Sequence, residues 1–99
     1  MGNVGTSYEY AVREFMEGWE FTADWLSRPT AARDLSLVAE TEFSSRKSQR
    51  SFVNKVLSIS TENPAEVAKA GRYARGQGDI ADYCEVVLQR LSAGGVIKA

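Results

Sequence analysis

The sequence contains no histidine and a single cysteine, Cys84, among its 99 residues. A nucleophile paired with histidine is therefore excluded, and so is a zinc site of the usual cysteine and histidine type. Cys84 has no partner for an internal disulfide, and a cytoplasmic setting is the default for such a chain. No pair of carboxylates stands out for acid–base catalysis. We therefore expect a protein that is not an enzyme and uses no cofactor.

Long apolar runs and strand-like alternation are also missing. No apolar stretch reaches about 18 residues, so we expect no membrane span. Apolar residues recur instead at steps of three and four, the spacing of amphipathic helices. These patterns predict an all-α fold: a compact, soluble bundle of about five short helices. We expect a single domain over residues 1–99, with flexible tails at 1–6 and 95–99.

The first predicted helix begins at the cap residue Ser7 and runs toward Leu26. It ends before Pro29, because the residue that precedes a proline avoids helical geometry. Its expected inward stripe consists of Tyr8, Val12, Phe15, Met16, Trp19, Ala23 and Leu26. Gly18 leaves a second interpretation open, in which the helix breaks there and the following residues bury a different face.

Cap residues mark four further helices: Thr30, Ser44 or Ser45, Asn63 with Pro64, and Asp79. The fourth helix turns mostly small residues inward, which predicts a close approach to a neighbour: Val67, Ala70, Gly71 and Ala74. The last helix has the clearest apolar stripe: Ile80, Tyr83, Cys84, Val87, Leu88 and Leu91. We expect Cys84 to pack there as a small hydrophobic residue. Asp79, Asp82 and Glu85 fit helix capping better than a metal site, so no metal is predicted.

Charge is segregated along the chain, although the net charge is only −1. Residues 1–42 carry eight acidic and three basic side chains (net −5), whereas residues 43–78 carry seven basic and two acidic ones (net +5). If the third and fourth helices are neighbours, six cations turned away from the apolar stripes share one surface: Arg46, Lys47, Arg50, Lys69, Arg72 and Arg75. Such a surface suits phosphates without sequence preference. The alternative is a solvated face that pairs with the acidic first helix.

The opposite face of the first predicted helix carries three aromatic residues, Tyr10, Phe21 and Trp25, with Glu14 and Glu17 between them. Aromatic residues of this kind anchor protein interfaces. This pattern supports the hypothesis of a protein–protein adaptor or inhibitor, such as a phage-encoded factor or a virion accessory subunit. A break at Gly18 is the competing explanation for the pattern.

Two stretches resemble one known family. In residues 45–56, the order Ser48, Gln49, Arg50, Phe52 and Val56 resembles a helix of the small helical subunit of type III CRISPR effector complexes. Residues 70–78, which contain Arg72 and Arg75 among alanines and glycines, resemble the later Ala-rich helix of that family. The amphipathic stripe of the last helix follows in the same order. The resemblance covers residues 43–91, and the small subunits of related type I complexes are similar bundles.

The resemblance implies a non-catalytic RNA-binding subunit in antiviral defence. Copies of the chain would stack with each other and with the other CRISPR effector subunits, along a filament that carries the guide RNA. They would contact the nucleic-acid backbone of the guide–target duplex or of the displaced strand, without reading bases. Arg50, the motif arginine, and Arg75, which closes the Ala-rich helix, are the implied phosphate contacts. Arg46, Lys47, Lys69 and Arg72 join them on charge and facing.

Overall fold

The computed structural model of the chain describes residues 4–19 and 23–97. All regular structure within this part is helical, which confirms the predicted all-α bundle of about five helices. The elements are α1 (Val4–Gly18), the 3-10 helix η1 (Ala23–Ser27), α2 (Ala31–Glu42), α3 (Arg46–Thr61), α4 (Pro64–Ala74) and α5 (Ile80–Ala93).

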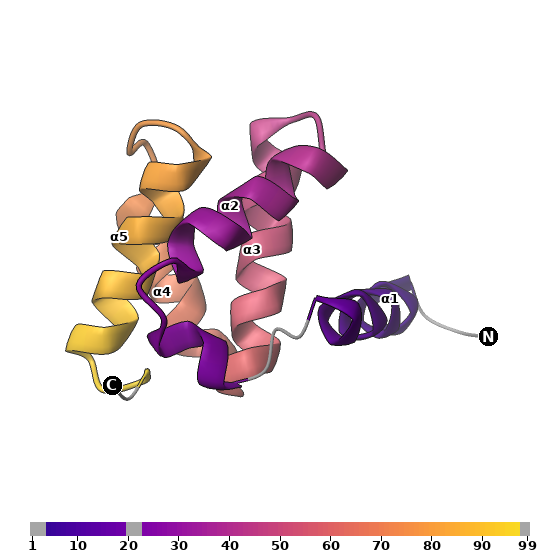
Figure 1. The fold of residues 1–99 in the computed structure, drawn as a ribbon, viewed down its shortest axis with the longest axis horizontal. Helices are drawn as coiled ribbons and strands as arrows, with labels where there is room; N and C mark the ends of the chain where they lie inside the picture. The colour runs from indigo at the N-terminus through magenta and orange to yellow at the C-terminus, as the bar shows by residue number, and fades with distance from the viewer. Residues whose placement is uncertain (1–3, 20–22, 98–99) are drawn as a thin grey trace.

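Helices α2 to α5 pack as a ring. α2 contacts α3 and α5, and α4 contacts the same two helices, so α2 and α4 occupy opposite corners. α1 lies beside this ring and packs chiefly against α3 (Figure 1). The molecule measures 40 × 26 × 23 Å, and α1 extends it along the longest direction.

One hydrophobic core joins the described elements. Helix α5 buries all six residues of its predicted stripe, and α4 buries all four of its predicted inward residues. A Cβ atom on Gly71 would lie 2.7 Å from Tyr83 Oη and 3.2 Å from Asn54 Nδ2. Any side chain at Gly71 would therefore push α4 away from its neighbours, which is why this helix carries small residues.

Three of the predicted cap residues bond the helices that they open. The side chains of Ser45, Asn63 and Asp79 each accept a hydrogen bond from a backbone N–H in the first turn. Thr30 precedes α2 as predicted, but its hydroxyl instead donates to Asp34 Oδ2 at 3.1 Å. The capping signals therefore give the positions of these four starts, while the bonding at Thr30 differs.

The first helix is shorter than predicted and begins earlier. α1 starts at Val4, so Val4–Thr6 of the expected tail are helical, and Ser7 lies inside the helix instead of capping it. Serine is tolerated inside a helix, and its preference for caps is no requirement. α1 ends at Gly18, where the lack of a Cβ atom lowers helix propensity. The Trp19 N–H still bonds back to the carbonyls of Phe15 and Met16, both at 3.2 Å.

Beyond Gly18, the inward and outward positions predicted for the two tryptophans are wrong. Trp19, expected in the inward stripe, is 53% exposed and stacks on Phe15. Trp25, expected on the outer contact surface, is only 3% exposed and belongs to the core. The helix break lets η1 bury a different face, which is the second interpretation of Gly18. Phe21 and the side chains of Tyr8 and Ala23 lie outside the described residues.

Residues 95–97 are bonded to the end of α5, whereas the sequence predicts a flexible tail at 95–99, of which residues 98–99 lie outside the described part. Gly95 has a φ of 78°, its N–H bonds to the Ser92 carbonyl at 3.1 Å, and the Val96 N–H bonds to the Leu91 carbonyl at 2.9 Å. These two bonds form a Schellman motif, in which a glycine in the left-handed region reverses the chain. Ile97 consequently folds back and is only 7% exposed.

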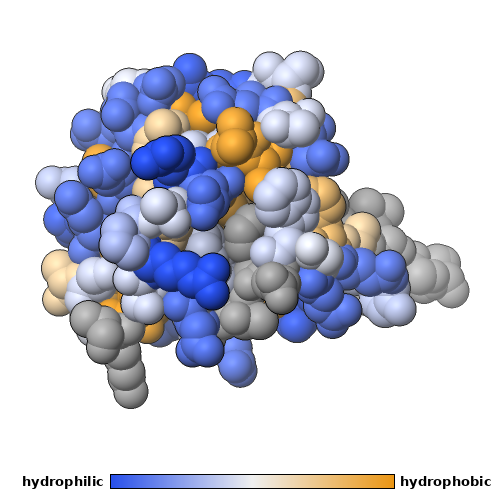
Figure 2. All heavy atoms as spheres, in the orientation of Figure 1, coloured by the Kyte–Doolittle hydropathy of each residue, from blue (hydrophilic) through white to orange (hydrophobic). Residues whose placement is uncertain are grey.

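The face that carries α2 is mostly hydrophilic, with a limited apolar patch. Figure 2, in the orientation of Figure 1, shows this patch over the region of α2, where Leu37 is exposed. Isolated exposed apolar residues are normal on a globular protein. We therefore assign no function to this patch.

Candidate nucleic-acid interface

The candidate basic surface begins at the N-terminus of α3. Ser45 caps this helix, so Arg46 and Lys47 fall in its first turn, which contains no acidic residue. The positive end of the helix dipole repels cations in this position, whereas an acidic side chain there would stabilise the helix. The arrangement costs the helix some stability and concentrates positive potential at its first turn.

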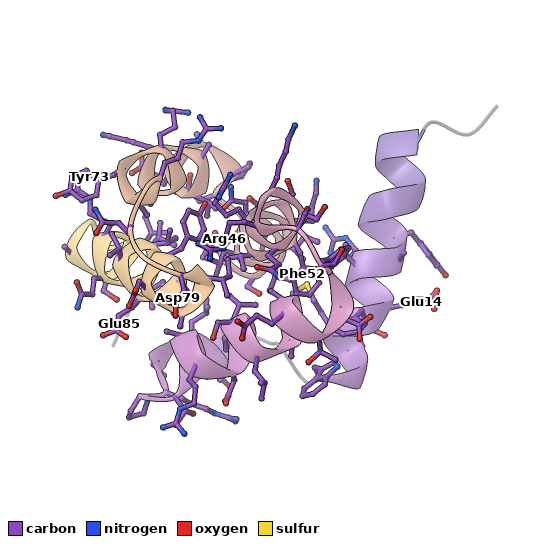
Figure 3. All side chains as sticks on the ribbon, turned by 90° about the horizontal axis from the view of Figure 1, so that it is seen from above. Glu14, Arg46, Phe52, Tyr73, Asp79 and Glu85 are labelled. Carbon is purple, nitrogen blue, oxygen red and sulfur yellow. The ribbon has the colours of Figure 1, made fainter. Side chains whose placement is uncertain are left out.

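Arg46 connects the start of α3 to the loop between α4 and α5. Its Nη1 donates a hydrogen bond to the Gly78 carbonyl at 2.7 Å, and in Figure 3 it lies near Asp79. The backbone N–H of Asp82 lowers the pKa of Asp79 most, and the Arg46 charge adds to this effect. Helical spacing predicts that Arg46 is turned outward, but its side chain also reaches the loop between α4 and α5. It also fixes the loop, using part of a guanidinium that has five N–H donors.

Arg50 lies on α3, and Arg75 is the residue that directly follows α4. Burial raises the pKa of the Tyr83 phenol, and the Asn54 hydrogen bond and the charges of Arg50 and Arg75 oppose this rise. Tyr83 itself links three helices, because its hydroxyl bonds Asn54 of α3 and lies beside Gly71 of α4. Arg50 is half-buried, whereas Arg75 is exposed. These are the two arginines that the family resemblance singles out.

A tight turn sets the direction of Arg75. Arg75 has φ −62° and ψ 129°, Gly76 has φ 91°, and the Gln77 N–H bonds to the Ala74 carbonyl at 3.0 Å. These values describe a type II turn, which needs glycine at its third position. Gly76 thus ends α4 and holds Arg75 at the corner of the bundle.

The other three predicted cations are spread over the same edge. Lys47, Lys69 and Arg72 are exposed, and α3 packs against α4. Figure 3 shows nitrogen-tipped side chains on these two helices extending away from α2. Lys69 lies toward α5, where it lines an open groove of about 290 Å³ with Glu66 and Arg90. Arg46 and Arg50 therefore lie one turn apart on α3, Arg75 follows α4, and Lys69 lines the groove between α4 and α5.

Two residues of this edge were not predicted from the sequence. Tyr73 is 57% exposed, and the Arg90 Cζ lies 3.7 Å from the centroid of its ring. Figure 3 shows Tyr73 pointing away from the bundle. A large aromatic next to Arg72, in a helix whose inward residues are small, was a signal in the sequence. The contact with Arg90 had no such signal, because it depends on how α4 and α5 pack.

The predicted aromatic contact surface is reduced to one described member. Tyr10 is 66% exposed on α1, while Trp25 is buried and Phe21 lies outside the described residues. Glu14 points away from the bundle on the same helix (Figure 3). Trp19, which was not part of the prediction, is the second exposed aromatic of this region.

The remaining reactive groups have structural roles. Cys84 is fully buried, and burial, with smaller effects from the Glu40 and Asp79 carboxylates, raises the pKa of its thiol to about 12. Such a thiol stays protonated at neutral pH and is a poor nucleophile, so the expected packing role of Cys84 is confirmed. Asp79 and Asp82 form a capping box. Within residues 4–19 and 23–97, no three acidic or cysteine residues gather in a way that could hold a metal.

None of the helices in the described ranges combines the length and apolarity of a membrane span. The chain was also compared with protein-family models, curated proteins and solved structures. None of these comparisons finds a match.

Proposed function

We propose that the chain is a non-catalytic subunit that binds the sugar–phosphate backbone of nucleic acid through the α3–α4 edge. The observation that carries this proposal is the placement of Arg46 and Arg50 one turn apart on α3, with Arg46 bonded to the α4–α5 loop that Arg75 begins. Phosphate oxygens are strong acceptors for guanidinium groups. Backbone contacts of this kind give affinity and register without sequence preference.

The first turn of α3 supports the proposal on energetic grounds. Arg46 and Lys47 oppose the helix dipole, an arrangement that costs about 0.3–1 kcal/mol for each charge near a helix end. A bound phosphate would offset both cations and would also face the N-terminal N–H groups of the helix. The local arrangement is unfavourable for the free protein and favourable for its complex with an anion.

The resemblance to the small subunits of CRISPR effector complexes supplies the context. In that setting, copies of the chain stack beside the larger subunits and hold the guide–target duplex or the displaced strand. The motif arginine, Arg50, and the arginine that closes the Ala-rich helix, Arg75, are the phosphate contacts that this resemblance implies.

The salt dependence of binding tests the proposal directly. Affinity for a short labelled RNA–DNA duplex is measured across salt concentrations for the native chain and for Arg50→Gln plus Arg75→Gln. The slope of log affinity against log salt falls by about one for each phosphate that the protein no longer neutralises. We expect a fall of about two for this variant. The matched control, Arg28→Gln plus Arg33→Gln, removes two exposed arginines from the α2 side and keeps the native slope. Equal slopes for both variants would refute the basic-edge assignment.

A pull-down from the native host tests the partners. Recovery with larger CRISPR subunits and short repeat-flanked RNAs supports the small-subunit proposal, whereas one unrelated protein without RNA contradicts it. In the adaptor alternative, the exposed aromatic residues Tyr10 and Trp19 would contact the partner protein. In that case Tyr10→Ala plus Trp19→Ala abolishes capture of the partner protein, and the arginine variant does not. Trp25 is unsuitable for this test, because its loss would damage the core.

A further inference from the structure

The exposed pair Tyr73 and Arg90 forms a flat platform beside the basic edge. The guanidinium carbon of Arg90 lies 3.7 Å from the centroid of the Tyr73 ring, which is a stacking distance. Tyr73 is nonetheless 57% exposed. An aromatic side chain kept at the surface leaves much of its apolar ring in water, so burial in the core does not explain its position.

Cations surround this platform on the same helix. Lys69 precedes Tyr73 by one helical turn, and Arg72 is its neighbour in the chain. Both are exposed. Arg90 and Lys69 also line the groove between α4 and α5, in which Glu66 is the acidic member. The carboxylate of Glu66 disfavours phosphates at its own end of the groove, so an anionic strand runs past Lys69 and Arg72.

We propose that Tyr73 stacks on an unpaired base, so that the ligand of the α3–α4 edge is a single-stranded nucleic acid. This inference rests on the proposed binding of nucleic acid by that edge. A base offers a π face of about the size of the phenol ring, and its phosphates suit the flanking cations. Basic grooves with aromatic platforms bind single strands in this way, because every base has a π face.

The Arg90 contact suits Tyr73 to this task. A guanidinium stacked on one face of the ring holds the phenol in one orientation before a ligand arrives. Pre-ordered side chains lose less conformational entropy on binding. In a duplex the bases are already stacked on each other and their faces are unavailable. Tyr73 therefore distinguishes an unpaired strand, such as a displaced one, from a paired one.

The experiment compares a labelled oligouridylate with a strand of the same length that carries abasic sites, which keeps the phosphates and removes the bases. We expect the native chain to bind the oligouridylate about 5- to 150-fold more tightly, the range for stacking of one base. Tyr73→Leu loses this preference and binds the abasic strand as the native chain does. Tyr73→Phe retains the preference. Tyr10→Leu, a change at an exposed tyrosine of α1, also retains it.

The outcomes separate the two proposals. Equal binding of both strands by the native chain overturns the stacking of a base and leaves backbone binding standing. An equal loss of affinity for both strands in Tyr73→Leu also overturns it, because the tyrosine would then act through structure alone. Failure to bind any strand or duplex overturns backbone binding and this inference together. The comparison of strands uses the native chain, so it is decisive even if Tyr73→Leu folds poorly.

Discussion

Tyr83 links three helices through a few atoms. Its hydroxyl donates to Asn54 Oδ1 of α3 at 2.7 Å, and the same oxygen lies only 2.7 Å from the position that a Cβ atom on Gly71 of α4 would take. A half-buried amide that loses such a partner carries a desolvation cost. The close packing of α3, α4 and α5 therefore depends on a hydroxyl, an amide and the absence of one methyl group.

This arrangement predicts coupled substitutions. Gly71→Ala lowers the free energy of unfolding by about 1–3 kcal/mol, because crowding outweighs the better helix propensity of alanine. Tyr83→Phe costs about 1–2 kcal/mol, because Asn54 loses its donor. In the double variant the crowding oxygen is gone, so the combined loss is smaller than the sum of the two. Urea unfolding of the four proteins measures this coupling, and strict additivity would contradict the packing described here.

Cys84 predicts a loss of stability at alkaline pH. The thiol pKa is raised from 9.0 to about 12 in the folded chain, so the unfolded chain releases this proton first. The stability is complete below pH 9 and falls by about 1.4 kcal/mol per pH unit as the pH rises toward the folded pKa. Unfolding free energies between about pH 8.5 and about pH 9.5 measure the onset of this fall, below the pKa of about 10 at which an unfolded tyrosine is half ionised. Cys84→Ala should flatten the curve in this window, and an unchanged slope would count against the assignment.

Single positions could be predicted where periodicity decides them. The stripe of α5 and the small inward residues of α4 follow from helical spacing alone, and both were predicted residue by residue. The Arg46–Gly78 bond and the Tyr73–Arg90 stack depend on the distance between packed elements. No spacing along the chain encodes that distance, so the charge of the candidate site was predictable and its geometry was not.

At the scale of elements, the reversal after α5 predicts a measurable contribution from the chain end. Ile97→Ala should lower the free energy of unfolding by about 2 kcal/mol, because a side chain that is 7% exposed leaves the core. Thermal or urea unfolding measures this loss. Leu37→Ala, at an exposed leucine of α2, is the control and should stay within about 0.5 kcal/mol. Equal small effects of both changes would mean that the end contributes nothing to stability.

Helix starts were predicted better than the extent of the first helix. Ser45, Asn63 and Asp79 bond their helices, so local chemistry is sufficient there. At Gly18 two outcomes were open, a continuous helix or a break. The burial of Trp25 in the core accompanies the break, and this tertiary contact is invisible in the local pattern.

At the scale of the molecule, α1 is the most separable element. It packs chiefly on α3, through Val12, Met16 and the edge of Phe15 against Phe52. Deletion of residues 1–19 should lower the melting temperature and leave the ring of α2 to α5 folded, because most residues of the shared hydrophobic core lie in η1 and the ring. Circular dichroism with thermal melting measures both effects. Trp25→Ala in the full chain provides the comparison and should cost about 3–5 kcal/mol. A deletion variant without cooperative unfolding would contradict this expectation.

The placement of α2 and α4 at opposite corners gives the molecule an electric dipole. Acidic side chains are exposed on α1 and α2, among them Glu14, Glu17, Glu40 and Glu42. The exposed cations Lys69, Arg72 and Arg75 lie on or directly after α4, across the ring from α2. A net charge of −1 does not attract a distant polyanion, but separated charges experience a torque in its field. If the chain binds nucleic acid as proposed, this torque turns its α4 corner toward the polyanion before contact, and the share of productive encounters rises. Because the Debye length is about 8 Å at physiological ionic strength, this turning takes place only during the final approach.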